Sequence, residues 1–315
     1  MKPKLLILIF LFITHIISSQ ENDFQENEID IPTNTEIIYG TLLTPNSVKK
    51  PPLVILIPGS GPTDRDGNNA VMKNNSLKYL AESLSKQKIA TYRFDKSVLT
   101  FTKKDTLKIK ALTFNTFINE ATSVIKYFKK SKKYSKIIIA GHSQGSLVGM
   151  VASQNNADAF ISLEGAGRPI DEILIEQIAK QAPYLKEETI RVLKELKQRK
   201  LVTDFNPMLI SLFNQQVQPF LISWIQYNPQ VEIKKLTIPI LIIQGTKDIQ
   251  VSIKDAELLH NANTTSKLQL IENMNHIFKE INGGVNENLQ SYSNPKLPIT
   301  PILTTTILNF INQLK

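Results

Sequence analysis

Hydrophobic and polar positions follow two different periods along this 315-residue chain. Short apolar runs predict strands, and apolar residues at helical spacing predict the helices between them. The strands are predicted at residues 36–43, 52–57, 89–94, 136–140, 159–163, 238–244 and 267–271. The helices are predicted at residues 76–86, 117–128, 146–152, 255–261 and 301–314. This alternation predicts an α/β fold in which a mostly parallel sheet is covered by helices on both faces.

One segment, residues 168–235, interrupts the alternation because it has helical patterns but no convincing strand. We interpret it as a helical cap inserted between two parts of the main domain, residues 20–167 and 236–315. The cap contains the single tryptophan, Trp224. This side chain is expected either to form a hydrophobic wall of a substrate pocket or simply to pack the cap onto the main domain.

The N-terminus has the pattern of a secretory signal peptide at residues 1–19. Two lysines precede an apolar stretch at residues 5–17, and two serines suited to cleavage follow it. The apolar stretch is too short to span a bilayer as a helix, although an uncleaved anchor is the alternative. We therefore expect an exported protein, periplasmic or secreted, that starts at Gln20 and has no integral membrane segment. The acidic and polar residues 20–34 are predicted to be a loose leader.

Composition narrows the possible partners and the source of stability. The chain has no cysteine, so an exported form has no disulfides and its stability must come from its core. The formal net charge of +9 comes from scattered lysines. Nucleic-acid binding requires a basic stripe or a known module, and the sequence has neither, so no nucleic-acid partner is expected.

The segment Gly141-His142-Ser143-Gln144-Gly145 lies between an apolar strand and a small-residue helix. This G-x-S-x-G pattern in a strand-turn-helix context is typical of a nucleophile elbow, which lifts a serine hydroxyl above the sheet. The two glycines fit because a Cβ at either position would clash with the adjoining elements. The alternative is a tight connection whose serine only caps the helix.

A serine nucleophile needs a base, and the chain has only four histidines. His15 lies in the predicted signal peptide, and His142 is adjacent to the serine on the same turn. His276 follows the last predicted strand, in a loop at the carboxyl end of the sheet, where open α/β sheets gather their chemistry. His276 is therefore the expected base, with His260 as the alternative.

The base needs an orienting carboxylate, and Asp248 follows the strand at 238–244 in the turn Gln244-Gly245-Thr246-Lys247-Asp248. Glu164, directly after the strand at 159–163, is the second candidate. Asp248 also fits a simpler role, that of a turn aspartate that caps the next helix.

Acyl transfer also needs donors for the oxyanion. The backbone N–H of Gln144 is the first candidate. The second is the N–H of Ser60, or alternatively of Gly61, in the glycine loop that follows the strand at 52–57. Gly61, His142 and Trp224 are expected to border the substrate pocket.

With these residues placed, nearly the whole mature chain resembles an α/β-hydrolase of the bacterial serine-aminopeptidase-like or esterase/lipase-like group. The resemblance rests on residues 58–68, 141–145, 165–169, 244–251, 273–276 and 291–295. It implies an α/β-hydrolase fold with Ser143 as nucleophile, Asp248 as orienting acid and His276 as base, in the chain order typical of that fold. It implies neither a metal nor an organic cofactor.

The sequence departs from that family after Arg93-Phe94-Asp95-Lys96. Relatives usually continue this motif into Arg-Gly-x-Gly, whereas here Ser97-Val98-Leu99-Thr100 follows. The loop is therefore expected to differ in shape. Arg93 and Asp95 are predicted to form a structural ion pair rather than to take part in catalysis.

Taken together, these features predict an exported serine hydrolase that cleaves a small-molecule carboxylic ester through an acyl-enzyme. One alternative is a peptidase that releases N-terminal residues. It would need an acidic group in the cap to hold the free amine, for which Glu172, Glu176, Glu187 and Glu188 are available. The other alternative is a non-catalytic binding module on a hydrolase fold.

Overall fold

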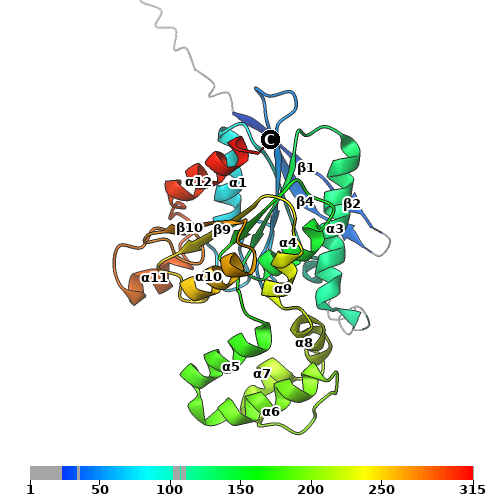
Figure 1. The fold of residues 1–315 in the computed structure, drawn as a ribbon, viewed down its shortest axis with the longest axis vertical. Helices are drawn as coiled ribbons and strands as arrows, with labels where there is room; N and C mark the ends of the chain where they lie inside the picture. Colours follow the sequence, from blue (N-terminus) through cyan, green and yellow to red (C-terminus); the bar gives the residue numbers. More distant parts are fainter. Residues whose placement is uncertain (1–22, 34–35, 102–106, 108–110, 315) are drawn as a thin grey trace, which may run out of the picture.

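The computed structural model describes residues 23–33, 36–101, 107 and 111–314, and its centre is an eight-stranded sheet (Figure 1). The strand order is β1-β4-β6-β5-β7-β8-β9-β10. β4 runs antiparallel to β1 and β6, whereas the pairings from β6 through β10 are parallel. The strands are β1 Phe24–Glu28, β4 Gly40–Pro45, β5 Leu53–Ile57, β6 Ala90–Phe94, β7 Ile137–His142, β8 Ala159–Leu163, β9 Ile240–Gly245 and β10 Lys267–Ile271. β2 (Ile31–Pro32) and β3 (Ile37–Ile38) form a separate two-stranded sheet.

Helices cover both faces of the sheet, because the central strands are apolar on both sides. On one face the core includes side chains of α3 (Phe114–Ser131), α4 (Gln144–Ser153), α9 (Pro229–Lys234) and α10 (Ile253–Ala262). On the other face it includes α1 (Ser76–Lys86) and α12 (Pro301–Asn312). The predicted α/β fold with a mostly parallel, helix-covered sheet is therefore confirmed.

Most predicted elements lie within a few residues of their observed bounds, and α1, β8 and β10 have the predicted bounds. The element predicted at residues 36–43 is two strands, β3 and β4. The prediction of a loose leader at residues 20–34 is wrong at Phe24–Glu28, because these residues form β1, which pairs with β4 and is an edge strand of the sheet. β1 is mostly exposed and polar, so its stability comes from backbone pairing, which leaves no hydrophobic pattern in the sequence.

The structure describes every residue from 168 to 235, and this segment contains helices but no strand. The helices are α5 Ile170–Gln181, α6 Lys186–Lys197, α7 Ile210–Phe213, α8 Gln218–Ile225 and α9, with short 3₁₀ turns at Pro183–Leu185 and Pro207–Leu209. α5 to α8 have an apolar cluster of their own, centred on Leu193, Phe213 and Leu221, and lie at one end of the sheet (Figure 1). α9 instead packs against α4 and α10, so it belongs to the sheet's core. From here on, "cap" means α5 to α8.

The expected signal peptide at residues 1–19 lies outside the described residues. Within the part of the chain that the structure describes, every helix is too short or too polar to cross a membrane.

Candidate active site

Ser143 sits at a strained turn between β7 and α4, with φ of 53° and ψ of −120°. The turn requires both glycines of the motif. A Cβ on Gly141 would lie 2.1 Å from the carbonyl oxygen of Gly145, and a Cβ on Gly145 would lie 2.4 Å from that of Ile57. Such contacts are too close for any side chain. The steric reason that the sequence suggested for the two glycines is therefore present in the structure. A non-glycine residue in this backbone region costs energy, and strain of this kind clusters at functional sites.

The register of the parallel strands brings the candidate residues to one edge of the sheet. His142 of β7 pairs with Leu163 of β8, and Leu163 pairs with Ile243 of β9. Ile271 of β10 pairs with Gly245. Ser143, Glu164 and the loops that carry Asp248 and His276 therefore all leave the sheet at its carboxyl edge, as expected for this class of sheet.

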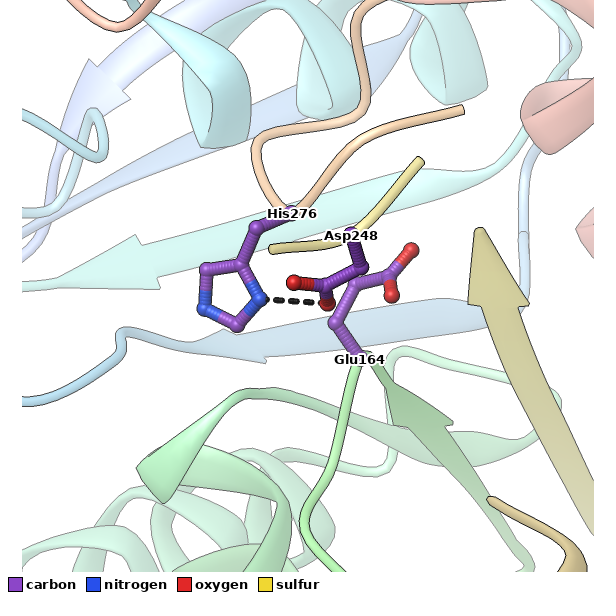
Figure 2. A group of neighbouring side chains, drawn as sticks. All are labelled: Glu164, Asp248 and His276. Carbon is purple, nitrogen blue, oxygen red and sulfur yellow. Dashed lines mark hydrogen bonds and ion pairs between the residues drawn. The ribbon is translucent and has the colours of Figure 1, made fainter. Parts of the chain in front are cut away.

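His276 and Asp248 are joined directly (Figure 2). Nδ1 of His276 lies 2.7 Å from Oδ2 of Asp248, and the exposed fractions of the two side chains are 4% and 0%. The other carboxylate oxygen, Oδ1, accepts hydrogen bonds from the backbone N–H groups of Gln250 and Val251. Burial alone would raise the pKa of Asp248, but the charge and hydrogen bond of His276 outweigh it and hold the pKa well below its usual range. Asp248 is therefore an ionised acceptor that orients the imidazole.

Glu164, the second candidate for the acid, lies next to Asp248 and is fully buried (Figure 2). The backbone N–H of Gly245 donates to its carboxyl at 2.9 Å. Nε2 of Gln244 donates both to Glu164, at 2.5 Å, and to Asp248, at 3.1 Å. Burial raises the pKa of Glu164 well above its usual value, and the neighbouring charge of Asp248 adds to the shift. Burial thus favours the protonated form of Glu164 beside the Asp248 carboxylate, and the hydrogen bond of His276 goes to Asp248.

Glu164, Asp248 and His276 also form a group whose ligand atoms lie within 4.8 Å of one another. Their hydrogen bonds argue against a metal site. N–H groups donate to both oxygens of each carboxyl, and Nδ1 of His276 is bonded to Asp248. These oxygens therefore already face donors rather than an open coordination site. The donor set fits an acid–base chain better than a cation site.

The other two described histidines have partners that explain them without catalysis. His260, the alternative base, lies in the last turn of α10 and its Nδ1 lies 2.9 Å from Oγ of Ser266. His142 is buried, and its Nε2 lies 2.8 Å from the backbone oxygen of His276. Burial, together with the nearby His276, lowers the pKa of His142 to about 3, so it stays neutral. His142 therefore supports the loop that carries His276.

Ser143 opens into a cavity of about 110 Å³ between the sheet and the cap. Ser60 and Gln144, the expected oxyanion donors, line the same cavity. Gln144 is the first residue of α4, where N–H groups have no partner within the helix. The remaining lining residues are Leu147, Ala166, Arg168, Ile170, Ile173, Gln177, Trp224, Pro229, Gln250 and Val251. Trp224 thus forms part of the wall, whereas Gly61 and His142, also expected there, do not.

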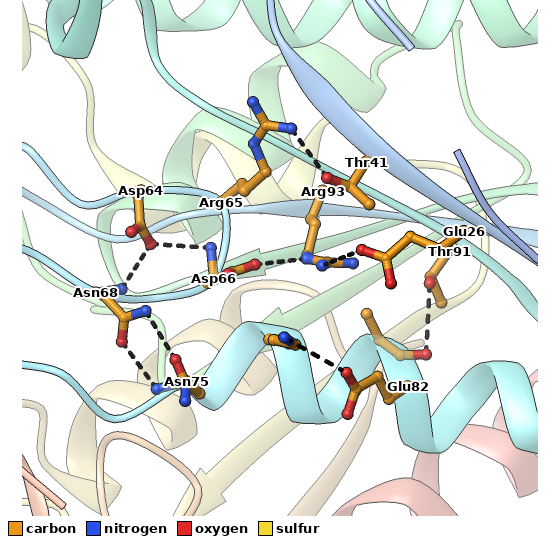
Figure 3. Close-up of polar contacts among 12 residues, drawn as sticks. Glu26, Thr41, Asp64, Arg65, Asp66, Asn68, Asn75, Glu82, Thr91 and Arg93 are labelled. Atoms are coloured by element: carbon orange, nitrogen blue, oxygen red, sulfur yellow. Dashed lines mark hydrogen bonds and ion pairs between the residues drawn. The ribbon is translucent and has the colours of Figure 1, made fainter. Parts of the chain in front are cut away.

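The loop that carries Ser60 is tied to the sheet by ion pairs, part of which Figure 3 shows. Arg65 makes two hydrogen bonds to Oδ2 of Asp95, at 2.8 and 3.0 Å. Nε of Arg93 donates to Asp66 at 2.7 Å. The predicted ion pair between Arg93 and Asp95 is therefore wrong, because each residue pairs with the loop after β5 instead. Proximity in sequence suggested that pair, whereas the folded loop supplies better-placed partners.

Lys96 is the next residue of the same motif, and the sequence alone indicates no role for it. Its Nζ donates to the backbone oxygens of Gly59 and Gly61 on the Ser60 loop. The loop expected to differ in shape from that of the family begins here and forms a 3₁₀ turn at Ser97–Thr100. Arg93, Asp95 and Lys96 thus all hold the loop that carries Ser60.

The comparisons with known proteins agree with this architecture. No protein-family model matches the chain. The chain is 28% identical over 265 residues to esterase EstD of Thermotoga maritima, and the match covers 79% of this chain but only 60% of that relative. The structure of Est1E from Butyrivibrio proteoclasticus matches with a TM-score of 0.59 at 19% identity and covers 91% of this chain and 99% of that one.

The esterase PF2001 of Pyrococcus furiosus matches with a TM-score of 0.54 at 14% identity and covers 96% of each chain. The similarity to Est1E and PF2001, at these low identities, is one of fold. The resemblance noted in the sequence therefore extends to the three-dimensional structure, which has the fold of known α/β-hydrolase structures.

Proposed function

We propose that this protein is a serine hydrolase that cleaves carboxylic esters, with Ser143, His276 and Asp248 as a catalytic triad. The observation that carries the proposal is the buried hydrogen bond between His276 and Asp248 at the sheet edge where Ser143 forms a strained turn. The similarity to esterase EstD supports the same chemistry. Acyl transfer from a serine requires both an exposed serine and a histidine oriented by a carboxylate.

In this mechanism Oγ of Ser143 attacks the ester carbonyl carbon while Nε2 of His276 accepts the hydroxyl proton. The N–H groups of Ser60 and Gln144 stabilise the oxyanion that forms. The C–O bond to the alcohol then breaks, and His276 gives its proton to the departing alcohol. Water attacks the acyl-enzyme with His276 again as base, which releases the acid and restores Ser143. Asp248 stabilises the imidazolium in both halves of the reaction.

The test is hydrolysis of p-nitrophenyl acetate by the wild type and by Ser143→Ala. We expect the variant to lose at least about 10³-fold in kcat, because removing a triad nucleophile leaves only residual catalysis by the rest of the site. Ser153→Ala is a matched control on the same helix, since its buried hydroxyl has no hydrogen-bond partner in the structure. Equal rates for the wild type and Ser143→Ala would contradict the proposal. Labelling with a fluorophosphonate tests the binding-module alternative, because a catalytic Ser143 should react with the probe and a non-catalytic one should not.

The cavity supports a short aliphatic acyl group as the acid part of the ester. Its volume of about 110 Å³ is smaller than the roughly 150 Å³ of an apolar protein cavity that holds benzene. Aromatic acyl groups are the competing class, because a structure of Est1E contains ferulic acid. A series of acetyl, butyryl, hexanoyl and feruloyl esters distinguishes them. We expect kcat/KM to be highest for the acetyl or butyryl ester.

The peptidase alternative is less well supported by the cavity. Among the described residues that line it, the cavity has the cation Arg168 and the amides of Gln177 and Gln250, but no carboxylate that would bind a free amine. Two of the cap carboxylates considered for that role already have partners, since Glu176 pairs with Arg168 and Glu188 with Arg191. Comparing an aminoacyl amide with its alkyl ester tests this preference.

We also propose that the protein is exported through cleavage of residues 1–19, which the charge and apolar pattern of that segment supports. N-terminal sequencing of protein recovered from periplasmic and culture-medium fractions tests this proposal. A chain that begins at Gln20 is expected, and one that keeps Met1 argues against it.

A further inference from the structure

Lys96 is a buried amine that binds the loop beside Ser143. Its Nζ lies 2.6 Å from the oxygen of Gly59 and 2.5 Å from that of Gly61, and the residue is 2% exposed. The ring of Phe117 on α3 lies 5.1 Å from the nitrogen. Burying an ammonium is costly unless partners compensate. The two carbonyls are such partners, and they lie on either side of Ser60.

The first of these carbonyls belongs to the same peptide group as the Ser60 N–H. The Gly59–Ser60 peptide is trans, as are all the others in the described chain. In a planar trans peptide the C=O and N–H bonds point in opposite directions. A cation bound to the Gly59 oxygen therefore fixes the direction of the Ser60 N–H on the opposite side. It also polarises the peptide, which makes the N–H a stronger donor.

This peptide lies beside the nucleophile. A Cβ built on Gly59 would lie 3.4 Å from Cβ of Ser143 and 3.3 Å from Nδ1 of His142. Ser60 and Ser143 line the same cavity. The N–H that Lys96 orients thus belongs to the backbone segment that packs directly against Ser143.

We propose that Lys96 is a positioning residue for ester hydrolysis, whose ammonium orients and polarises the Gly59–Ser60 peptide so that the Ser60 N–H stabilises the oxyanion. The proposal rests on the proposed serine-hydrolase function. Burial lowers the pKa of Lys96 to about 8, against the opposing charge of Glu120, so the amine remains mostly protonated at neutral pH. The bond to Gly61 ties the other side of Ser60 to the same nitrogen.

The test compares Lys96→Met and Lys96→Gln with the wild type on p-nitrophenyl acetate. An oxyanion interaction exists only in the transition state, so its loss lowers kcat and leaves KM nearly unchanged. We expect a fall in kcat of about 10- to 100-fold, somewhat less than for removing a donor outright. A short alkyl boronic acid, which forms a tetrahedral adduct on serine, should bind more weakly by a factor similar to the loss of kcat/KM.

Lys279 provides a matched control. It is fully buried, its Nζ donates to the oxygens of Asn74 and Leu297 at 2.9 and 2.5 Å, and the ring of Tyr79 lies 4.8 Å away. Neither carbonyl lies next to Ser60: Asn74 is at the far end of the loop, just before α1, and Leu297 is in a different loop. Lys279→Met is therefore expected to lower the melting temperature while kcat and boronate affinity stay close to those of the wild type.

The outcomes separate this proposal from the proposed function. A wild-type rate equal to that of Ser143→Ala means that the function itself is wrong. An active wild type with unchanged kcat and boronate affinity in folded Lys96→Met overturns only the role of Lys96, as does an equal loss of kcat in Lys279→Met. If neither Lys96 variant folds, Lys96→Arg keeps a cationic donor and should retain most of kcat. A loss of kcat in folded Lys96→Arg as large as that expected for Lys96→Met overturns the proposal.

Discussion

The sheet and the cap are built on the same principle, a buried apolar cluster, but they contribute different things to the candidate site. The loops at the carboxyl edge of the sheet supply Ser143, Asp248, His276 and Ser60. The cap supplies apolar and amide side chains of the cavity wall, such as Ile173 and Gln177. The proposed chemistry thus depends on aligned strands, whereas part of the cavity wall comes from a unit with an apolar cluster of its own.

Ring stacking, hydrogen bonds and ion pairs join the two regions. The rings of Phe114 on α3 and Trp224 on α8 stack 5.5 Å apart, and the Phe114 N–H donates to Oγ of Ser223 at 2.7 Å. On the other side, Arg168 makes two hydrogen bonds to Asp255 of α10. The comparison teaches that the proposed catalytic residues and the cap side of the cavity wall have different structural supports, which variants can separate.

The largest expected effect is on the sheet side. Asp248→Asn should lower kcat by about 10⁴-fold, because the amide favours the wrong imidazole tautomer and no longer stabilises the imidazolium. Steady-state hydrolysis of p-nitrophenyl acetate measures the loss. Glu164→Gln is the control, since it keeps a buried hydrogen-bonding group beside Asp248, and its effect on kcat should be much smaller. A larger loss for Glu164→Gln would assign the role of the acid to Glu164.

The next effect concerns stability. Phe160 of β8 and Phe213 of α7 are both fully buried, one in the sheet's core and one in the cap's cluster. Replacement of either by alanine should cost about 3–5 kcal/mol of the free energy that stabilises its own cluster. Hydrogen exchange should show that Phe160→Ala weakens the sheet, whereas Phe213→Ala opens α5 to α8 and leaves β7 and β8 protected. Equal loss of protection in both regions would mean that cap and sheet unfold as one unit.

The third effect is on the pH dependence of stability. A buried carboxyl on the sheet side and an exposed one on the cap change the stability in opposite directions as the pH rises. Burial raises the pKa of Glu120 on α3 to about 7, although hydrogen bonds from Ser97 and the charge of Lys96 oppose the shift. Because the folded form holds this proton more tightly, Glu120 contributes stability below about pH 4.5 that is lost as the pH rises to about 7. The contribution is about 3 kcal/mol. Urea unfolding across this range should show a smaller decline for Glu120→Gln than for the wild type.

Glu176 on the cap provides the contrast. Hydrogen bonds from Lys180 and Arg168 lower its pKa, so its contribution is present above about pH 4.5 and is lost on acidification. The effect should be small because the carboxylate is exposed and screened. For Glu120, the contradicting outcome is a loss of stability between about pH 4.5 and pH 7 that is the same in Glu120→Gln as in the wild type. Other groups would then cause that loss.

The smallest effect is on the cap side of the cavity. Ile173→Ala should enlarge the cavity and raise kcat/KM for hexanoyl relative to acetyl esters by about tenfold, the scale expected for a few methylene groups. Ile175→Ala is the matched control, because Ile175 packs against the cap's apolar cluster and does not line the cavity. The same change of acyl preference in both variants would mean that the cap acts through its overall stability rather than through the wall at Ile173.

The sequence is most informative about the candidate site where the signal is local. The glycines at 141 and 145 identified the turn, and the shortage of histidines pointed to His276, which the structure joins to Asp248. It was less informative about partners distant in the chain. The link of Asp95 to Arg65 and the bonds from Lys96 to the Ser60 loop depend on loops that fold beside each other only in the complete sheet.

The sequence by itself determined the alternation of strands and helices, the α/β class and the position of Ser143, because periodicity and glycine sterics act within a few residues. Only the tertiary structure decided that the polar segment Phe24–Glu28 is a strand, that Glu164 lies buried beside Asp248, and that Lys96 holds the peptide of Ser60. These features depend on which neighbours the fold brings together, since pairing, burial and charge compensation are properties of contacts between distant segments. The cavity likewise exists only where the cap meets the sheet edge.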